Sequence, residues 1–158
     1  MSVEMNKASL RRFTGEIFNN GNLDILPELM TTNVVLHSAV GTDIQSLDGI
    51  KQFCMSTKVA FPDWHEDIEN LIAEGDMVVA KCAESGTFKH EFMGLAPTGK
   101  TYSVKGVLLV RYEGSKIAEI WSYYDMLSLC RQLDIPLSFF DQLCGCVPVS
   151  YRSLCQGI

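Results

Sequence analysis

Carboxylates and aromatic rings alternate along one stretch near the end of the chain. It runs from Lys116 to Asp125, between a glycine turn and a helical pattern, and reads as a β-strand. Residues two apart in a strand share a face, which groups these side chains: Ile117, Glu119, Trp121, Tyr123 and Asp125. The apolar surroundings of a carboxylate at the end of such a face raise its pKa. A carboxylate with a pKa nearer to neutral pH can act as a general base. The pattern predicts that Asp125 is a general base or that it caps the helix that follows.

Two further residues could complete such a site. Tyr123 could donate a hydrogen bond to a substrate oxyanion, or it could be a core aromatic with its hydroxyl at the rim. Glu66 shares a strand face with Trp64 among apolar neighbours, which makes it a candidate for a second acid/base group. Carboxylates in such positions more often lie on solvated faces. Asp67 or Glu69 would replace Glu66 if the other face of that strand points inward.

The composition excludes several classes of protein and of site. The 158 residues suit one domain, and a net charge of -6 without a basic cluster argues against a nucleic-acid partner. No apolar run is long enough to span a membrane and no secretory signal is evident, so we expect a cytoplasmic protein. The three histidines lie far apart and no glycine-rich phosphate loop occurs, so we predict no metal and no cofactor.

The six cysteines are expected to be thiols rather than disulfides. Cys54, Cys82 and Cys130 occupy apolar positions of predicted elements, as buried free thiols do. Cys144 and Cys146 are too isolated to indicate a metal site.

Hydrophobic periodicity predicts helices first and then long strands. The helices are expected at about 6–19, 23–30, 48–61 and 126–133, with Asp48 as the N-cap of the third. The strands are expected at 33–37, 64–73, 77–90, 101–112 and 116–125, with a hairpin turn at Gly75. This order predicts an α+β fold, in which a strongly curved, mixed or antiparallel sheet holds helices in its concave side.

The predicted strands carry short motifs in a fixed order. They are Gly75-Asp76-Met77-Val78, Ser85-Gly86-Thr87, Phe92-Met93-Gly94, Pro97-Thr98-Gly99-Lys100, and the stretch Gly114–Asp125 with Lys116-Ile117, Glu119 and Trp121. With Ala60-Phe61-Pro62-Asp63 and the stretch Ile72–Asp76, this order resembles the SnoaL-like polyketide cyclases over about residues 10–134. The resemblance implies a cone-shaped α+β barrel of the nuclear-transport-factor-2-like kind, with an apolar cavity at its open end.

The resemblance also implies an activity. Such an enzyme would need no cofactor and would use proton transfer to cyclise or isomerise a polyketide-derived or terpenoid intermediate. Its substrate would be an apolar small molecule, and the protein would be a homodimer packed through its sheets. Asp125 matches the aspartate that acts as acid/base in the family. The alternative is a non-catalytic protein that binds an apolar ligand, because one fold hosts both functions.

Two histidines relate to the family pattern less directly. Family members carry a histidine directly after Gly-Thr, where this chain has Phe88, and His90 follows two residues later on the same predicted strand face. His90 could still reach the cavity, or it could be a surface histidine. His37 matches a histidine after the family's first short strand and could likewise be a polar pocket group or a surface residue.

The expected substrate contacts and domain limits complete the prediction. The residues expected to bind substrate are Trp121, Phe88, Trp64, Glu119 and Leu108. Residues 1–135 are expected to form the barrel domain. Residues 136–158 exceed the family pattern and are expected to pack on the barrel, over the pocket mouth or against a partner subunit.

Overall fold

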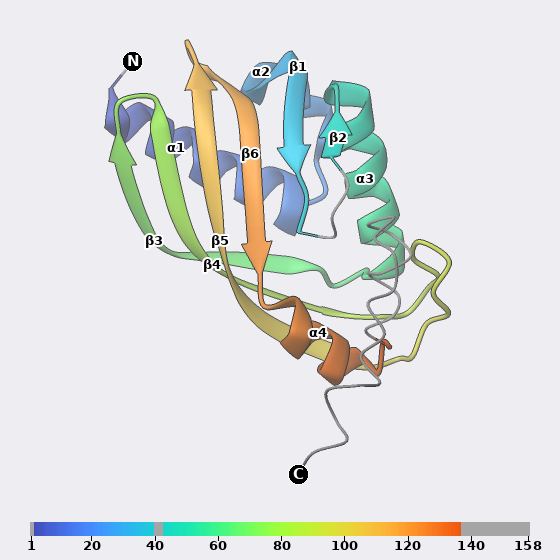
Figure 1. Cartoon of the computed structure of the whole chain (residues 1–158). Coiled ribbons are helices and arrows are strands. Elements are labelled where there is room, and N and C mark those ends of the chain that lie inside the picture. The colour runs from blue at the N-terminus through green and yellow to red at the C-terminus, as the bar shows by residue number, and fades with distance from the viewer. Residues whose placement is uncertain (1, 40–42, 137–158) are drawn as a thin grey trace, which may run out of the picture.

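The strands form one curved sheet in the computed structural model, which describes residues 2–39 and 43–136 (Figure 1). The six strands lie in the order β2-β1-β6-β5-β4-β3. They are β1 (Met30–His37), β2 (Asp43–Gln45), β3 (His65–Glu74), β4 (Met77–Thr87), β5 (Thr101–Glu113) and β6 (Lys116–Tyr124). β1 pairs with β6 in parallel, and the other neighbouring pairs are antiparallel. The predicted α+β fold with a mixed sheet is confirmed.

The long helices pack on one face of this sheet, which we call the inner face. The helical elements are α1 (Val3–Phe13), η1 (Thr14–Asn19, a π-helix), η2 (Leu23–Ile25), α2 (Leu26–Leu29), α3 (Leu47–Ala60) and α4 (Met126–Leu133). Leu10 of α1 and Ile50 of α3 are buried in one core cluster with Val78 and Leu108 of the sheet. Figure 1 shows α1 behind the sheet and α3 beside β1 and β2. In the described ranges no helix has the length and apolar character to cross a membrane.

The hairpin predicted at Gly75 is confirmed. Gly75 has a φ of 57°, a backbone conformation that favours glycine, and β3 and β4 pair antiparallel on either side of it. The predicted buried thiols are also confirmed for Cys54, Cys82 and Cys130. The other cysteines and the predicted packing of the C-terminal extension lie outside the described residues.

The entry into α3 differs from the prediction. Ser46 caps this helix, because its hydroxyl accepts a hydrogen bond from the amide of Gly49 at 3.3 Å. The predicted cap, Asp48, instead lies in the first turn, where a carboxylate also suits the helix dipole. The preceding strand β2 was not predicted, because three residues carry too little alternation to be recognised.

The strand β4 ends at Thr87 rather than at residue 90. The amides of Lys89 and His90 donate to the carbonyl of Ala60, at 2.9 and 3.2 Å, and so do not continue the ladder with β5. His90 therefore lies in a loop and not on a strand face.

A β-bulge in β6 reverses which side chains face the core. Ile117 pairs with Tyr112 while Glu119 pairs with Arg111, which leaves Ala118 as an extra residue in the strand. Beyond Ala118 the inner residues are Ile120, Ser122 and Tyr124, and the outer residues are Glu119, Trp121 and Tyr123. The predicted common face of Ile117 and Tyr123 is therefore wrong.

A second bulge acts in the same way in β3. The pairing with β4 shifts between Ile68 and Asn70, so Glu69 is the extra residue. Glu66 and Ile68 point inward before the shift, and Ile72 is 67% exposed after it. The predicted face is correct for the first half of this strand only.

Candidate functional site

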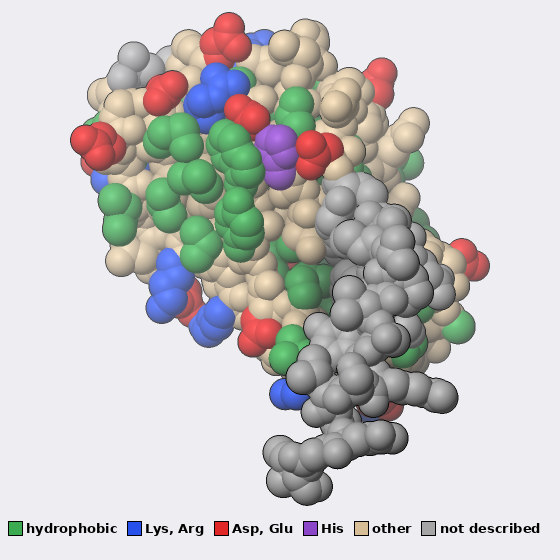
Figure 2. Space-filling view, in the orientation of Figure 1, with side chains coloured by type: hydrophobic (Ala, Val, Ile, Leu, Met, Phe, Trp, Pro, Cys, Tyr) green, Lys and Arg blue, Asp and Glu red, His purple; other side chains and the backbone are tan. Residues whose placement is uncertain are grey.

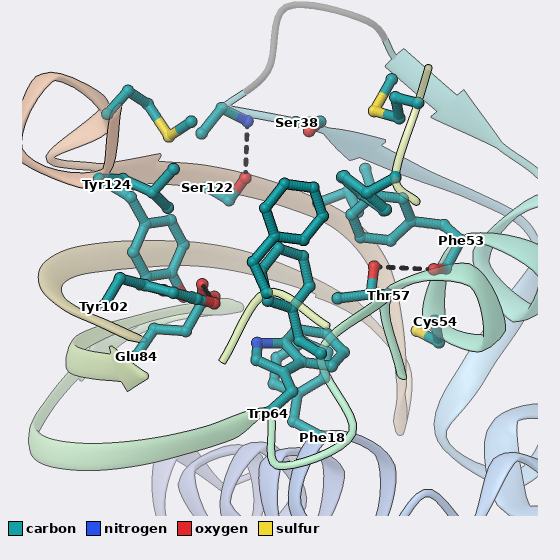
Figure 3. Close-up of a pocket in the computed structure, with 18 of the residues that line it drawn as sticks. Phe18, Ser38, Phe53, Cys54, Thr57, Trp64, Glu84, Tyr102, Ser122 and Tyr124 are labelled. Carbon is teal, nitrogen blue, oxygen red and sulfur yellow. Dashed lines mark hydrogen bonds between the residues drawn. The ribbon is translucent and has the colours of Figure 1, made fainter. Parts of the chain in front are cut away.

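A cavity of about 140 Å³ opens on the inner face of the sheet, between α3 and α4 (Figure 3). Aromatic rings make much of its wall: Phe18, Phe53, Phe61, Trp64, Phe88 and Phe92. Phe61 stacks on Phe88 with ring centroids 5.1 Å apart, and Phe18 packs on Trp64 at 4.6 Å. A cavity of roughly this volume accommodates a benzene-sized ring. The walls therefore suit the apolar ring of a small molecule.

Glu84 supplies a carboxyl to this apolar space. Among the described residues that line the cavity, it is the only one with a carboxyl, and none carries a basic side chain. The hydroxyl of Tyr102 donates to its Oε1 at 2.7 Å (Figure 3). Burial raises the pKa of Glu84, and the hydrogen bond from Tyr102 opposes that rise. The side chain keeps some exposure because it borders the cavity.

Trp64 adds a polar group to the same wall. Its indole N–H lies close enough to Glu84 to lower the pKa of that carboxyl. Nevertheless Nε1 is buried and meets no acceptor with the distance and angle of a hydrogen bond. The indole N–H is therefore a buried donor without a hydrogen-bond acceptor, on a residue whose side chain helps to line the cavity.

Glu66 lies beside Glu84, because the two residues are direct partners in the β3–β4 pairing. Directly opposed side chains share a face, with Cβ atoms about 5 Å apart. The hydroxyl of Tyr124 donates to Oε2 of Glu66, and the hydroxyl of Thr14 reaches Oε1 at 3.5 Å. Glu66 is 1% exposed. Burial and the nearby charge of Glu84 raise its pKa to about 8, although the Tyr124 hydrogen bond opposes the rise.

The π-helix η1 anchors this corner of the sheet. Its wider turn, seen in the 3.0 Å bond from the Asn20 amide to the Gly15 carbonyl, brings Thr14 and Asn19 to the same side. Asn19 then bonds both backbone groups of Glu66: Oδ1 accepts from the amide at 2.8 Å, and Nδ2 donates to the carbonyl at 3.0 Å. The backbone that carries the buried carboxyl is thus fixed by two side-chain hydrogen bonds.

Four predicted site residues lie in or against the cavity. Trp64, Phe88 and Leu108 line it. Glu66 is bonded to Tyr124, which also lines it. Phe88, which stands where the family pattern has a histidine, contributes an apolar wall and no proton-transfer group.

Four other predicted site residues lie on the outer face of the sheet: three on β6, because of its bulge, and one on β1. They are Glu119, Trp121, Tyr123 and His37. His37 bonds Glu119 at 2.9 Å through Nε2 and Asp43 at 3.0 Å through Nδ1, and its ring stacks on Trp121 at 5.1 Å. Its pKa is raised, chiefly by the hydrogen bond with Glu119.

Asp125 and His90 also lie away from the cavity. Asp125 is exposed, and its Oδ1 accepts from the amide of Ser128 at 2.9 Å, so it caps α4. His90 is exposed in the loop after β4. Neither residue is among those that line the cavity.

Sequence reasoning missed Glu84, Tyr102 and Tyr124. A signal for Glu84 exists, because it continues the alternating apolar positions of Val78, Ala80 and Cys82 along β4. A carboxyl on such a face is expected to be buried. Tyr124 carries no comparable signal, since the bulge in β6 decides its direction.

The chemistry available at this site is proton transfer between carboxyl and phenol groups. The described residues contain no group of three or more His, Cys, Asp or Glu side chains that could hold a metal ion. The cavity instead combines one carboxyl, tyrosine hydroxyls and an indole donor with apolar walls. These groups can take a proton from a substrate carbon and stabilise the resulting enolate.

Comparisons with known proteins identify the family of this chain. The family model named SnoaL-like polyketide cyclase matches residues 8–133. A candidate polyketide cyclase from Acidithiobacillus ferrooxidans has 28% identity and a TM-score of 0.72, covering 85% of this chain and 98% of that one. The candidate polyketide cyclase IdmH from Streptomyces antibioticus has 26% identity and a TM-score of 0.69, covering 82% and 98%.

A third structure shares the fold at lower identity. It is a candidate SnoaL-like polyketide cyclase from Jannaschia, with 22% identity and a TM-score of 0.77, covering 84% of this chain and 94% of that one. A comparison with curated protein sequences found no match.

Proposed function

Because the chain belongs to the SnoaL-like polyketide cyclase family, we propose that it is a cofactor-independent cyclase or isomerase that works by general acid/base proton transfer. The proposed substrate is a polyketide-derived or terpenoid intermediate of secondary-metabolite biosynthesis. The observation that carries the proposal is the Glu84 carboxyl, which borders an apolar cavity and has a raised pKa.

Glu84 is the proposed base, in place of Asp125. A general base must come within hydrogen-bonding reach of the proton that it takes, and Glu84 borders the space where a substrate would bind. The carboxyl of Asp125 is engaged in the cap of α4. Burial makes the Glu84 carboxylate more basic, which suits removal of a proton from the carbon next to a carbonyl.

Trp64 is the proposed donor to the substrate oxygen. A buried donor without an acceptor costs about 1–3 kcal/mol. A small movement of the Trp64 ring on substrate binding would let a carbonyl oxygen satisfy it. As the proton leaves, negative charge develops on that oxygen and strengthens the hydrogen bond. The interaction therefore stabilises the transition state more than the bound substrate.

The substrate is proposed to be uncharged where it enters the cavity. A carboxylate or phosphate there would lose its hydration, and the described lining offers no basic side chain in return. A neutral ketone, enone or β-dicarbonyl compound fits the walls and has the acidic C–H bond that the proposed step needs.

Isomerisation of cyclohex-3-en-1-one to its conjugated isomer tests the proposal. The reaction removes a proton next to a carbonyl, its ring suits the cavity, and ultraviolet absorbance follows the product. We expect the protein to accelerate the reaction over buffer and Glu84→Gln to reduce kcat about 10²- to 10⁴-fold. Asp125→Asn is expected to keep its activity, because asparagine caps a helix nearly as well.

Two outcomes would contradict this assignment. Equal rates for the wild-type protein and Glu84→Gln would exclude Glu84 as the base. Loss of activity in a folded Asp125→Asn protein would instead indicate that Asp125 is the base. A wild-type protein that binds the ketone in calorimetry without turnover would support the alternative of a non-catalytic binding protein.

We also propose that the protein is a homodimer formed through the outer face of the sheet. Ile72, Val107 and Tyr123 are 67%, 38% and 61% exposed there. Figure 2 shows hydrophobic side chains gathered on this side of the molecule. Apolar patches of this kind mark interaction sites. Light scattering is expected to give a dimer for the wild type and a monomer for Tyr123→Glu, and a wild-type monomer at micromolar concentration would contradict the proposal.

The domain limits and the location stay proposals as well. Residues 1–135 are proposed to form the barrel domain of a cytoplasmic enzyme, and residues 136–158 to pack on the barrel, the pocket mouth or a partner. Removal of residues 137–158 is expected to change the oligomeric state in solution, the free energy of unfolding or the KM for the ketone. A truncated protein with unchanged oligomeric state, stability and KM would contradict such packing.

A further inference from the structure

We propose that Glu66 and Glu84 form a coupled pair that holds one proton between them, and that Tyr124 passes the proton of Glu66 to the substrate. The inference rests on the proposed function, since it assigns Glu84 as the base. It adds the acid of the same reaction. Glu66 would act through Tyr124, while Tyr124 would itself touch the substrate.

The geometry of the sheet brings the two carboxyls together. Glu66 and Glu84 are direct cross-strand partners, so both side chains leave the sheet on its inner face at the same level. Each carboxyl has its own tyrosine, since Tyr124 donates to Glu66 and Tyr102 donates to Glu84. Tyr102 of β5 and Tyr124 of β6 come from neighbouring strands, and both line the cavity with Glu84 (Figure 3).

Within the described part of the chain, the groups around the pair supply hydrogen bonds and no positive charge. The side chains that hydrogen-bond or electrostatically influence the two carboxyls are Thr14 of η1, Trp64 before β3, Cys82 of β4, Tyr102 of β5 and Tyr124 of β6. Lys58 of α3 lies nearby, but its ammonium group bonds the backbone carbonyls of Asn19 and Trp64. Two adjacent buried carboxylates without a cation repel each other, so one of them keeps its proton.

A single shared proton gives the site an acid and a base at once. The Glu84 carboxylate takes a proton from the substrate carbon, and the C–H electron pair moves through the carbonyl to make an enolate. The enolate then forms its new bond, either to a proton or to a second carbonyl carbon. When Glu66 holds the proton, the bond between the two groups is reversed: the carboxyl O–H donates to the phenol oxygen, and the Tyr124 hydroxyl turns toward the cavity that its ring lines. Tyr124 then gives its hydroxyl proton to the carbon or to the new alkoxide, while the Glu66 carboxyl gives its proton to the phenol oxygen.

The pair ends this cycle with its proton on the other carboxyl. Glu84 is then protonated and Glu66 ionised, so the number of protons on the pair is unchanged. Because the two carboxyls lie side by side, transfer of the proton from Glu84 to Glu66 restores the starting state. No proton from bulk water is required, which suits a cavity with apolar walls.

Carbon NMR of protein labelled at the glutamate side-chain carboxyl carbon tests the pair without any substrate. We expect Glu66 and Glu84 to titrate in two well-separated steps, with one protonated carboxyl at pH 7. Glu84→Gln should move the Glu66 titration to lower pH, because it removes the neighbouring charge that raises the pKa of Glu66. Two carboxyls that are both ionised at pH 7, or a Glu66 titration unchanged in Glu84→Gln, would overturn the pair.

Tyr124→Phe tests the relay with cyclohex-3-en-1-one as the probe. The ring that lines the cavity is kept, so KM should be unchanged while kcat falls about 10²-fold. Tyr112→Phe is the matched control, since it removes another buried hydroxyl, which donates to the carbonyl of Asn6 at 3.0 Å. Equal kcat values for Tyr124→Phe and Tyr112→Phe would overturn the relay. Because the NMR titration needs no turnover, failure of the pair is distinguishable from failure of the proposed function.

Discussion

Glutamate side chains have opposite pKa shifts on the two faces of the sheet. Glu66 and Glu84 on the inner face meet tyrosine hydroxyls, and burial raises the pKa of each. Glu119 and Glu69 on the outer face have lowered pKa values, because Glu119 bonds His37 and Glu69 bonds Lys105. Charge partners and water favour an ionised carboxylate, while burial without a cation favours a protonated one. The face of the strand thus decides whether a glutamate is a surface ion or a proton-transfer group.

The contrast depends on the bulge in β6. If Ala118 paired as a regular strand residue after Ile117, Tyr123 would point inward and Tyr124 outward. Glu66 would then lack its hydrogen bond from Tyr124, and the aromatic side chain of Trp121 would leave its stack on His37. One extra residue therefore determines both the composition of the cavity and that of the outer face.

Glu66→Gln should have the largest effect on stability. Because the pKa of Glu66 is about 8 in the folded protein, the native state keeps its proton where the unfolded chain has lost it. The free energy of unfolding of the wild type should therefore fall as pH rises from about 4.5 to 8, by an amount on the order of a few kcal/mol. Glu66→Gln should flatten this slope in urea unfolding. The exposed Glu113→Gln variant should keep it.

A wild-type protein that becomes more stable across this pH range would contradict the assignment of an unpaired buried carboxyl. Comparison of slopes, rather than of absolute values, removes any constant difference in packing between glutamate and glutamine.

Gly106→Ala should distort the inner face. Its effect on the free energy of unfolding should be slightly smaller than that of Glu66→Gln. An added Cβ would lie 2.3 Å from the Tyr124 ring and 2.8 Å from the Tyr123 carbonyl, so the ring has to move. We expect a loss of about 1–3 kcal/mol in the free energy of unfolding, together with reduced isomerase activity. Ser103→Ala is the control, because it introduces an alanine on the same strand at an exposed position. Unchanged stability and activity in Gly106→Ala would show that Tyr124 is not held by this contact.

The fold could be predicted from the sequence further than the site could. Gly75 and the strands around it follow from local turn chemistry and alternation, which depend on neighbours in the chain. The directions of Tyr124 and Ile72 depend on bulges at Ala118 and Glu69, which result from pairing with another strand. Asp125 illustrates the same limit, since its sequence fits both a base and a cap, and only its position relative to the cavity separates the two.

Tyr102→Phe and Tyr123→Phe compare tyrosines on the two faces. The Tyr102 hydroxyl bonds Glu84 and favours its ionised form, so its loss should raise the pKa of Glu84 and move the pH–rate profile to higher pH. We expect kcat at pH 7 to fall about tenfold, the effect of roughly 1.4 kcal/mol. Tyr123→Phe should leave the profile unchanged, because Tyr123 is 61% exposed on the outer face. Identical profiles for both variants would contradict the assignment of Tyr102 to the site.

Glu119→Gln should have the smallest effect on the free energy of unfolding. The pH dependence of this effect should have the opposite sign to that of Glu66→Gln. The lowered pKa of Glu119 means that its ion pairs with His37 and Arg111 stabilise the protein above the pKa of the unfolded carboxyl. That contribution is lost as pH falls through the folded pKa. We expect Glu119→Gln to lower the free energy of unfolding at pH 7 by at most about 1 kcal/mol, because partly exposed pairs are screened by water and salt. The difference from wild type should shrink as pH falls through the lowered pKa of Glu119 and in high salt, as urea unfolding can measure. If Glu119→Gln became more stable relative to the wild type as pH rises, Glu119 would behave like the inner carboxyls. The contrast between the two faces would then be contradicted.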